Sequence, residues 1–189
     1  MARVPYVAAP TAPDDAASRR LADLYAEIGG LRGSVLNLYR ALANQPPALR
    51  AFMAMSRYVR DDAELPANLR ELAVLATAYA LDVPYEEYHH IPAARRAGVT
   101  GEQLAAFPDW AASDAFDATE RAVLTYADRV ARARDVDDAT FEALRARLPL
   151  PQVVDLALTV GWYHLCAAVL GPLRIETEAE TAGADSSSQ

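Results

Sequence analysis

The sequence predicts an all-α protein, and three observations support this class. Apolar residues recur at spacings of three and four through most of the 189-residue chain. Alanine, leucine and arginine, which favour helices, dominate, whereas β-branched residues other than valine are sparse. Prolines and glycines fall where segments of helical length would begin and end. With 52% hydrophobic residues, the chain is expected to bury one full core.

Each predicted helix is bounded by a capping side chain, a proline at its start or a glycine after its end. In chain order the predicted helices cover residues 15–28, 34–43, 46–60, 66–81, 85–97, 117–133, 137–148 and 151–170. Gly29 and Gly30 are expected to end the first helix, and Pro66 to start the fourth. Only Asp82, Val83 and Pro84 separate the fourth helix from the fifth, which predicts an antiparallel hairpin.

The two ends of the chain are predicted to lie outside a helical domain of residues 14–175. Residues 1–13 contain three prolines among small residues, which predicts an extended arm. Residues 176–189 end in a run of serines and are expected to be disordered.

The charged residues exclude several classes of chemistry. The sequence contains no lysine, so Schiff-base catalysis, a lysine-bound pyridoxal cofactor and a Walker-type phosphate loop are excluded. A balance of 18 basic to 26 acidic residues disfavours a nucleic-acid partner. The local arginines at 95–96 and 129–134 lie among acids and are interpreted as solvated helix faces.

Targeting and redox features predict a cytoplasmic protein without a membrane partner. The N-terminal residues lack the apolar run of a signal peptide, and no segment is expected to reach the roughly 18 apolar residues that a membrane span requires. The single cysteine, Cys166, permits no internal disulfide or dithiol pair. We interpret it as a packing residue rather than a nucleophile.

The polar residues of the predicted hairpin are the main candidates for chemistry. Glu86 and His90 are four residues apart and share a helix face, as do Tyr85 and His89, while Glu71 lies among apolar residues of the preceding helix. A carboxylate that binds one imidazole nitrogen fixes the tautomer and leaves the other nitrogen to act as acid or base. An ordinary surface ion pair is the alternative. A metal site of Glu71, Glu86 and His90 is unspecific, so no metal is predicted.

Further candidates lie in the last predicted helix. His164 falls in an otherwise apolar segment, so it is either a hydrogen-bonded core residue or faces a cavity. Trp162 and Tyr163, together with Tyr85 and Tyr88, could line an aromatic pocket or belong to the core.

The hairpin resembles that of the carboxymuconolactone decarboxylase family, which reads Arg-Glu, a spacer, Tyr-Glu-Trp-x-x-His, then Ala and Gly. The matching segments are Arg70-Glu71-Leu72, residues 85–90 and 94–100, with residues 37–46 upstream. The resemblance covers about residues 34–175. It implies an AhpD-like helical bundle built around the hairpin, a small-molecule substrate, and a homo-oligomer, either trimer or hexamer.

The related AhpD-like hydroperoxidases carry a Cys-x-x-Cys pair in this hairpin, with a glutamate and a histidine that relay protons. Their glutamate corresponds to Glu71 and their histidine to His90. Val83 and Glu86 occupy the two cysteine positions, so the resemblance does not extend to thiol peroxidase chemistry.

The decarboxylase branch looks closer and implies a cofactor-independent lyase. Such an enzyme removes carbon dioxide from a small carboxylated lactone, or another enolisable carbonyl compound, and then protonates the enolate. By resemblance, His90 is the proton donor, Glu86 orients it, and Glu71 is a second relay whose pKa burial would raise. Arg70 is the nearest candidate for the substrate carboxylate. The remaining residues expected to bind substrate are Tyr85, His89, His164 and Trp162.

Departures from the family pattern leave alternatives open. The family's tryptophan position holds Glu87, with the aromatic shifted to Tyr88, and His164 stands where asparagine is frequent. A cofactor-free isomerase or dehydratase of the same family therefore remains an alternative. So does a non-catalytic ligand-binding or scaffold protein that keeps the hairpin for packing.

Overall fold

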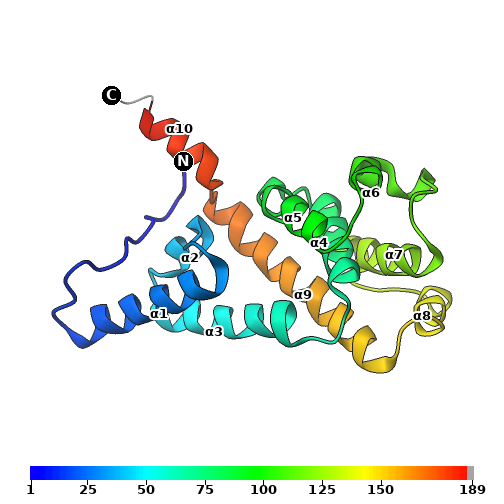
Figure 1. The fold of residues 1–189 in the computed structure, drawn as a ribbon, viewed down its shortest axis with the longest axis horizontal. Helices are drawn as coiled ribbons and strands as arrows, with labels where there is room; N and C mark the ends of the chain where they lie inside the picture. The colour runs from blue at the N-terminus through cyan, green and yellow to red at the C-terminus, as the bar shows by residue number, and fades with distance from the viewer. Residues whose placement is uncertain (187–189) are drawn as a thin grey trace. The chain divides into compact units, whose positions relative to one another are not determined.

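A computed structural model describes the backbone of residues 1–186 and the side chains of residues 1–182. All regular secondary structure in this part of the chain is helical, which confirms the all-α class (Figure 1). The helices are α1 (Ala16–Arg32), α2 (Asn37–Leu42), α3 (Pro46–Arg57), α4 (Ala67–Leu81), α5 (Pro84–Arg96), α6 (Gly101–Ala106), α7 (Ala118–Ala133), α8 (Asp138–Arg145), α9 (Leu150–Leu173) and α10 (Glu178–Ser186). A π-helical turn, η1 (Tyr58–Asp62), and a 3₁₀ helix, η2 (Phe107–Ala112), complete the described elements.

The chain forms two compact units, whereas the sequence predicted one domain over residues 14–175. One unit combines residues 1–57 with the chain from residue 170 onward, and the other contains residues 58–169. Helix α9 begins in the second unit and ends in the first. A division of this kind is hard to predict because its boundary falls inside a continuous helix.

Residues 1–13, expected to form an extended arm, contain no regular secondary structure and are attached to the first unit. The backbone N–H of Val7 donates to the carbonyl of Arg40 at 3.1 Å, and the hydroxyl of Tyr25 donates to the carbonyl of Val7 at 2.9 Å. The backbone N–H of Arg3 likewise donates to the carbonyl of Leu173. These bonds correct the expectation that the arm lies apart from the helices.

Helix α1 does not end at Gly29 and Gly30 but continues to Arg32. The helix ends at Gly33, where φ is 79° and the backbone N–H donates to the carbonyl of Gly29. Helices commonly end at a residue in the left-handed backbone conformation, which glycine adopts without steric cost. Gly29 and Gly30 keep helical dihedrals instead.

The segment 176–189, predicted to be disordered, contains helix α10. Thr177 and Glu180 cap its start, because the backbone N–H of Glu180 donates to the Thr177 hydroxyl while Glu180 accepts from the Thr177 N–H. The sequence analysis did not weigh this capping pair against the polar composition of the tail. Residues 187–189 lie outside the described residues.

The predicted hairpin is present in the second unit. Helix α4 begins after Pro66 and ends at Asp82, whose φ of 54° turns the chain into α5. Helix α4 packs against both α5 and α7. Its buried leucines join apolar side chains of α7 and α9, and Tyr79 stacks on Phe107 with ring centroids 5.4 Å apart. The hairpin therefore lies in the core of this unit.

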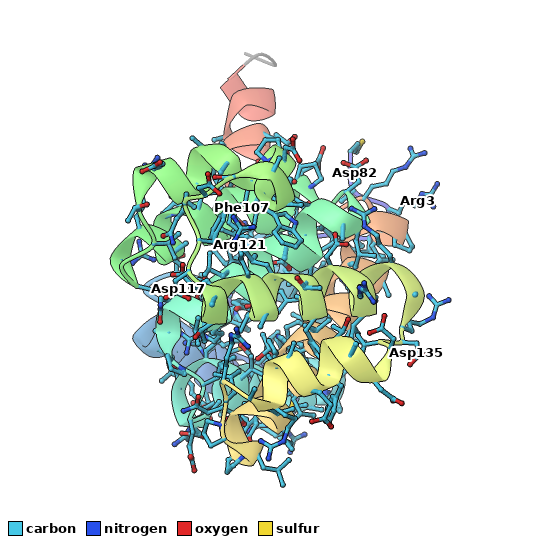
Figure 2. All side chains as sticks on the ribbon, turned by 90° about the vertical axis from the view of Figure 1, so that its right-hand side faces the viewer. Arg3, Asp82, Phe107, Asp117, Arg121 and Asp135 are labelled. Carbon is cyan, nitrogen blue, oxygen red and sulfur yellow. The ribbon has the colours of Figure 1, made fainter. Side chains whose placement is uncertain are left out.

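Local side-chain bonds fix the start of α7 and the loop before it. Asp117 accepts from the backbone N–H groups of Thr119 and Glu120 and marks the start of α7, whereas Asp135 follows its other end (Figure 2). Arg121 donates to the carbonyl of Ser113 and so fixes the loop that precedes α7.

One helical segment, Leu150–Ala182, is long and apolar enough to cross a membrane by length and composition, contrary to the sequence-based expectation. Half of its most apolar stretch is buried in the structure, and core helices often have the same composition. The expectation failed because isolated polar residues such as Asp155 and His164 interrupt the apolar run but leave the mean hydropathy of the segment high.

Candidate active site

Helices α4 and α5 bring Glu71, Glu86 and His90 into contact. His90 Nδ1 lies 2.7 Å from Glu71 Oε2, and His90 Nε2 lies 3.4 Å from Glu86 Oε2. Glu71 is 3% exposed, Glu86 5% and His90 2%. The surface-pair interpretation of Glu86 and His90 is therefore wrong, because the shared face of α5 is turned into the core.

Tyr163 from α9 completes the surroundings of His90. Its hydroxyl lies 3.1 Å from His90 Nε2, and the two rings meet edge to face with centroids 4.9 Å apart. From the sequence, Tyr163 was expected either to line an aromatic pocket or to belong to the core. One available signal was that a buried tyrosine usually finds a hydrogen-bond partner for its hydroxyl.

The thiol of Cys166, one turn further along α9, interacts with Glu86. Burial, and then the nearby Glu86 carboxylate, raise the pKa of the Cys166 thiol well above its usual value. A thiol in this state is a weak nucleophile, which agrees with its interpretation as a packing residue. We call Glu71, Glu86, His90, Tyr163 and Cys166 the His90 cluster.

The two carboxyl groups of the His90 cluster have pKa values shifted in opposite directions. Burial tends to raise the pKa of Glu71. The hydrogen bond to His90, the charge of His90 and the charges of two arginines outweigh burial, so the pKa of Glu71 is lowered. Burial raises the pKa of Glu86, and the charges of His90 and its neighbours offset this only in part. Glu71 therefore holds its negative charge more firmly than Glu86.

This result exchanges the roles expected for the two carboxylates. The resemblance implied that Glu86 orients the imidazole and that burial raises the pKa of Glu71. The structure places Glu71 closer to the ring, since the neighbouring helix α4 presents its carboxylate directly to Nδ1. Glu71 orients the imidazole, and Glu86 is the carboxyl that gains a proton more readily.

Two arginines supply positive charge beside the His90 cluster. Arg70 Nε lies 3.4 Å from Glu71 Oε1, so this side chain is directed at Glu71. Arg60, which the sequence analysis did not consider, lies in the π-helical turn η1, and its charge lowers the pKa of Glu71, Glu86 and Tyr163. Single π-helical turns occur frequently at functional sites.

The other predicted substrate-binding residues lie on α5 and α9. Tyr85 and His89 contact each other on α5, with ring centroids 4.6 Å apart. Burial, then the charge of Arg134, lower the pKa of His164, which lies beside α7. Trp162 is buried on α9, but its neighbour Tyr163 is the residue that meets His90.

Other features of the second unit lie apart from the His90 cluster. Among the residues the structure describes, no group of three or more histidine, cysteine or acidic side chains is arranged to hold a metal ion. A pocket of about 490 Å³ is lined by acidic and apolar residues of η1 and α9 and by Glu64, and none of them belongs to the cluster. At this pocket Tyr58 donates to Asp155 at 2.6 Å.

Residues 46–129 match the model of the carboxymuconolactone decarboxylase family. This range runs from α3 into α7 and contains Glu71, Glu86 and His90, but it ends before Tyr163. The resemblance inferred from the hairpin is thus confirmed. No curated protein matches the sequence.

Solved structures of AhpD-like proteins share the fold. An uncharacterized peroxidase-related protein from Ralstonia eutropha JMP134, described as an alkylhydroperoxidase AhpD core, is 25% identical with a TM-score of 0.78, covering 95% of this chain and 93% of that one. A peroxidase-related protein from Silicibacter sp. TM1040 is 20% identical with the same TM-score, covering 95% and 96%. A cysteine-to-alanine variant of the debrominase Bmp8, in complex with 2,3,4-tribromopyrrole, is 17% identical with a TM-score of 0.78 and covers 95% of each chain.

Proposed function

We propose that this protein, whose residues 46–129 carry the hairpin of the carboxymuconolactone decarboxylase family, is a cofactor-independent lyase. In this proposal it removes carbon dioxide from a small carboxylated lactone or another enolisable carbonyl compound. The observation that carries the proposal is the buried position of His90 between two carboxyl groups with opposite pKa shifts. Oppositely shifted pKa values are typical of paired acid and base groups in active sites.

The proposed reaction balances without a redox cofactor. The bond between the substrate's carboxylate carbon and its neighbour breaks, carbon dioxide leaves, and the electron pair remains on the substrate as an enolate. A proton from solvent or from the Glu86 carboxyl first binds His90 at Nε2, since Nδ1 faces Glu71. The protonated ring then donates that proton to the enolate carbon and returns to its neutral state.

The surroundings of His90 support this proton transfer. The ionised Glu71 carboxylate stabilises the positive charge that the ring gains when it is protonated, at a contact of 2.7 Å. Arg60 and Arg70 place positive charge beside the cluster, where they would stabilise a substrate carboxylate and the enolate that replaces it.

A thiol reaction is not part of this proposal, although the structural neighbours include peroxidase-related proteins and a debrominase. The hairpin holds Val83 and Glu86 where the hydroperoxidases carry their cysteines. Cys166 is buried, and its raised pKa keeps the thiol protonated.

A scaffold role is the second candidate, and the burial of the His90 cluster favours it. Both ring nitrogens of His90 have partners within the protein, as expected of a polar network that fixes a core. A scaffold would need no proton transfer to a ligand, so an activity screen separates the two candidates.

The test is a screen of carboxylated lactones and β-keto acids for carbon dioxide release, with wild type, His90→Gln and Glu87→Gln. Glu87 neighbours Glu86 on α5 but lies outside the cluster, so its variant is the matched control. The proposal predicts release by wild type and Glu87→Gln, and a loss of at least about 100-fold in His90→Gln. Equal release by all three, or none from any substrate, would overturn it.

A further inference from the structure

We propose that Tyr163 is a positioning residue that holds the His90 ring through Nε2, so that the ring, when neutral, carries its proton on Nδ1. The geometry that supports this is the contact of 3.1 Å between the Tyr163 hydroxyl and His90 Nε2. The tyrosine comes from α9, whereas His90 and Glu71 come from α5 and α4. Three helices therefore fix one imidazole.

The proton on His90 is assigned from what each neighbour can offer. Glu71 holds its charge, because the His90 contact and the nearby arginines lower its pKa, and an ionised carboxylate can only accept hydrogen bonds. The 2.7 Å contact with Glu71 therefore requires a proton on Nδ1. In the neutral ring this leaves Nε2 as an acceptor.

Tyr163 is suited to donate to that acceptor. Burial raises the pKa of its hydroxyl well above the usual value, so the phenol keeps its proton. The groups that contact Nε2 are Tyr163 from α9 and Glu86 from α5. The charges of Arg60 from η1, Glu71 from α4 and Cys166 from α9 also act on Tyr163. Glu86 Oε2 lies further from Nε2, at 3.4 Å. The tyrosine hydroxyl is therefore the closer partner.

A hydroxyl is a suitable partner because it can reverse its role. It donates to Nε2 when the ring is neutral and, by rotating about its C–O bond, accepts from Nε2 when the ring is protonated. Glu71 accepts from Nδ1 in both states. The ring can therefore gain and lose a proton without turning, and its Nε2 side stays aligned for transfer.

The test is ¹⁵N spectroscopy of the full-length chain labelled at histidine, which has three histidines. His90→Gln assigns the His90 signals. The neutral ring of wild-type His90 is expected to be one tautomer, with the proton on Nδ1 and a hydrogen-bonded Nε2. Tyr163→Phe is expected to move the Nε2 signal toward that of an unbonded nitrogen and to shift the tautomer ratio about three- to tenfold.

The matched control is Tyr126→Phe, because Tyr126 is also a buried tyrosine of the second unit but lies on α7. It should leave the His90 signals in place. The proposal fails if Tyr163→Phe changes them no more than Tyr126→Phe does. It also fails if the neutral ring of wild-type His90 carries its proton on Nε2, a measurement that does not depend on the folding of any variant.

The consequence for turnover rests on the proposed function, whereas the tautomer does not. If carbon dioxide release is found, Tyr163→Phe should lower kcat with little change in KM and shift the pH profile, because it leaves the ring less well aligned. If no release is found but the tautomer responds to Tyr163→Phe, the lyase proposal fails and the positioning role stands. Unchanged kcat with an unchanged pH profile would contradict the role in turnover.

Discussion

Replacing each cluster carboxyl by its amide should change stability in opposite directions. Glu71→Gln and Glu86→Gln are the same chemical change beside the same imidazole. Folding lowers the pKa of Glu71. Ionised Glu71 therefore stabilises the folded protein above the pKa of an unfolded glutamate, about 4.3, and this stabilisation is lost as pH falls through the pKa of Glu71 in the folded protein. Folding raises the pKa of Glu86. Protonated Glu86 therefore contributes its full stabilisation below the pKa of an unfolded glutamate, and this contribution is lost as pH rises through the pKa of Glu86 in the folded protein.

The magnitude at pH 7 follows from the contacts. Glu71 makes a charge-assisted hydrogen bond of 2.7 Å to a buried ring, and such bonds contribute about 1.5–3 kcal/mol. Glu71→Gln should therefore lower the Tm by about 5–10 °C for a chain of this size. Glu86→Gln removes a buried carboxylate and should raise the free energy of unfolding by about 1 kcal/mol.

Thermal and urea denaturation, followed by circular dichroism from pH 4 to pH 8, would measure both effects. Glu142→Gln, at an exposed position on α8, is the control for loss of one negative charge. The difference between wild type and Glu71→Gln should shrink as pH falls. If Glu86→Gln destabilised the protein as much as Glu71→Gln does at pH 7, the assignment of opposite pKa shifts to the two carboxyl groups would be refuted.

Three other predictions concern residues outside this pair. Native Cys166 should resist iodoacetamide at pH 8 and react at least about tenfold faster in urea, because its thiol is buried with a raised pKa; equal rates would contradict this. Arg134 has a φ of 59°, a left-handed conformation that costs a non-glycine residue free energy, so Arg134→Gly should stabilise the protein by about 0.5–1 kcal/mol in urea denaturation. A loss of stability would contradict this cost. Helix α9 has an exposed apolar face formed by Leu150, Val154 and Leu165, and we expect this face to contact a second copy of the chain. Leu165→Glu should therefore lower the molecular mass measured by light scattering, and an unchanged mass would argue against that contact.

The fold was predictable where a single local signal decides the structure. Pro66 and the residues Asp82-Val83-Pro84 bound α4 and α5 within one or two residues of the predicted ends. Local signals failed where two of them compete. Gly29 and Gly30 are permitted in a helix as well as at its end, and only the positive φ of Gly33 shows which glycine ends α1.

Part of the His90 cluster was predictable, but its geometry was not. The spacing of Glu86 and His90 predicted a shared face of one helix, and the resemblance pointed to Glu71. Neither signal ranks contacts between helices, and the resemblance assigned the orienting role to Glu86, whereas Glu71 lies closer to the ring. Tyr163 is 73 residues from His90, and no local pattern could have paired them.

The most direct test of the central claim, that His90 delivers a proton to a carbanion inside the protein, is decarboxylation in D₂O with a prochiral substrate found by the screen. A proton held by an enzyme side chain reaches one face only, so wild type should give product with one deuterium in a single configuration. Any residual reaction of His90→Gln should give both configurations. Equal amounts of the two configurations from wild type would show that solvent protonates the released enolate, and would contradict the account.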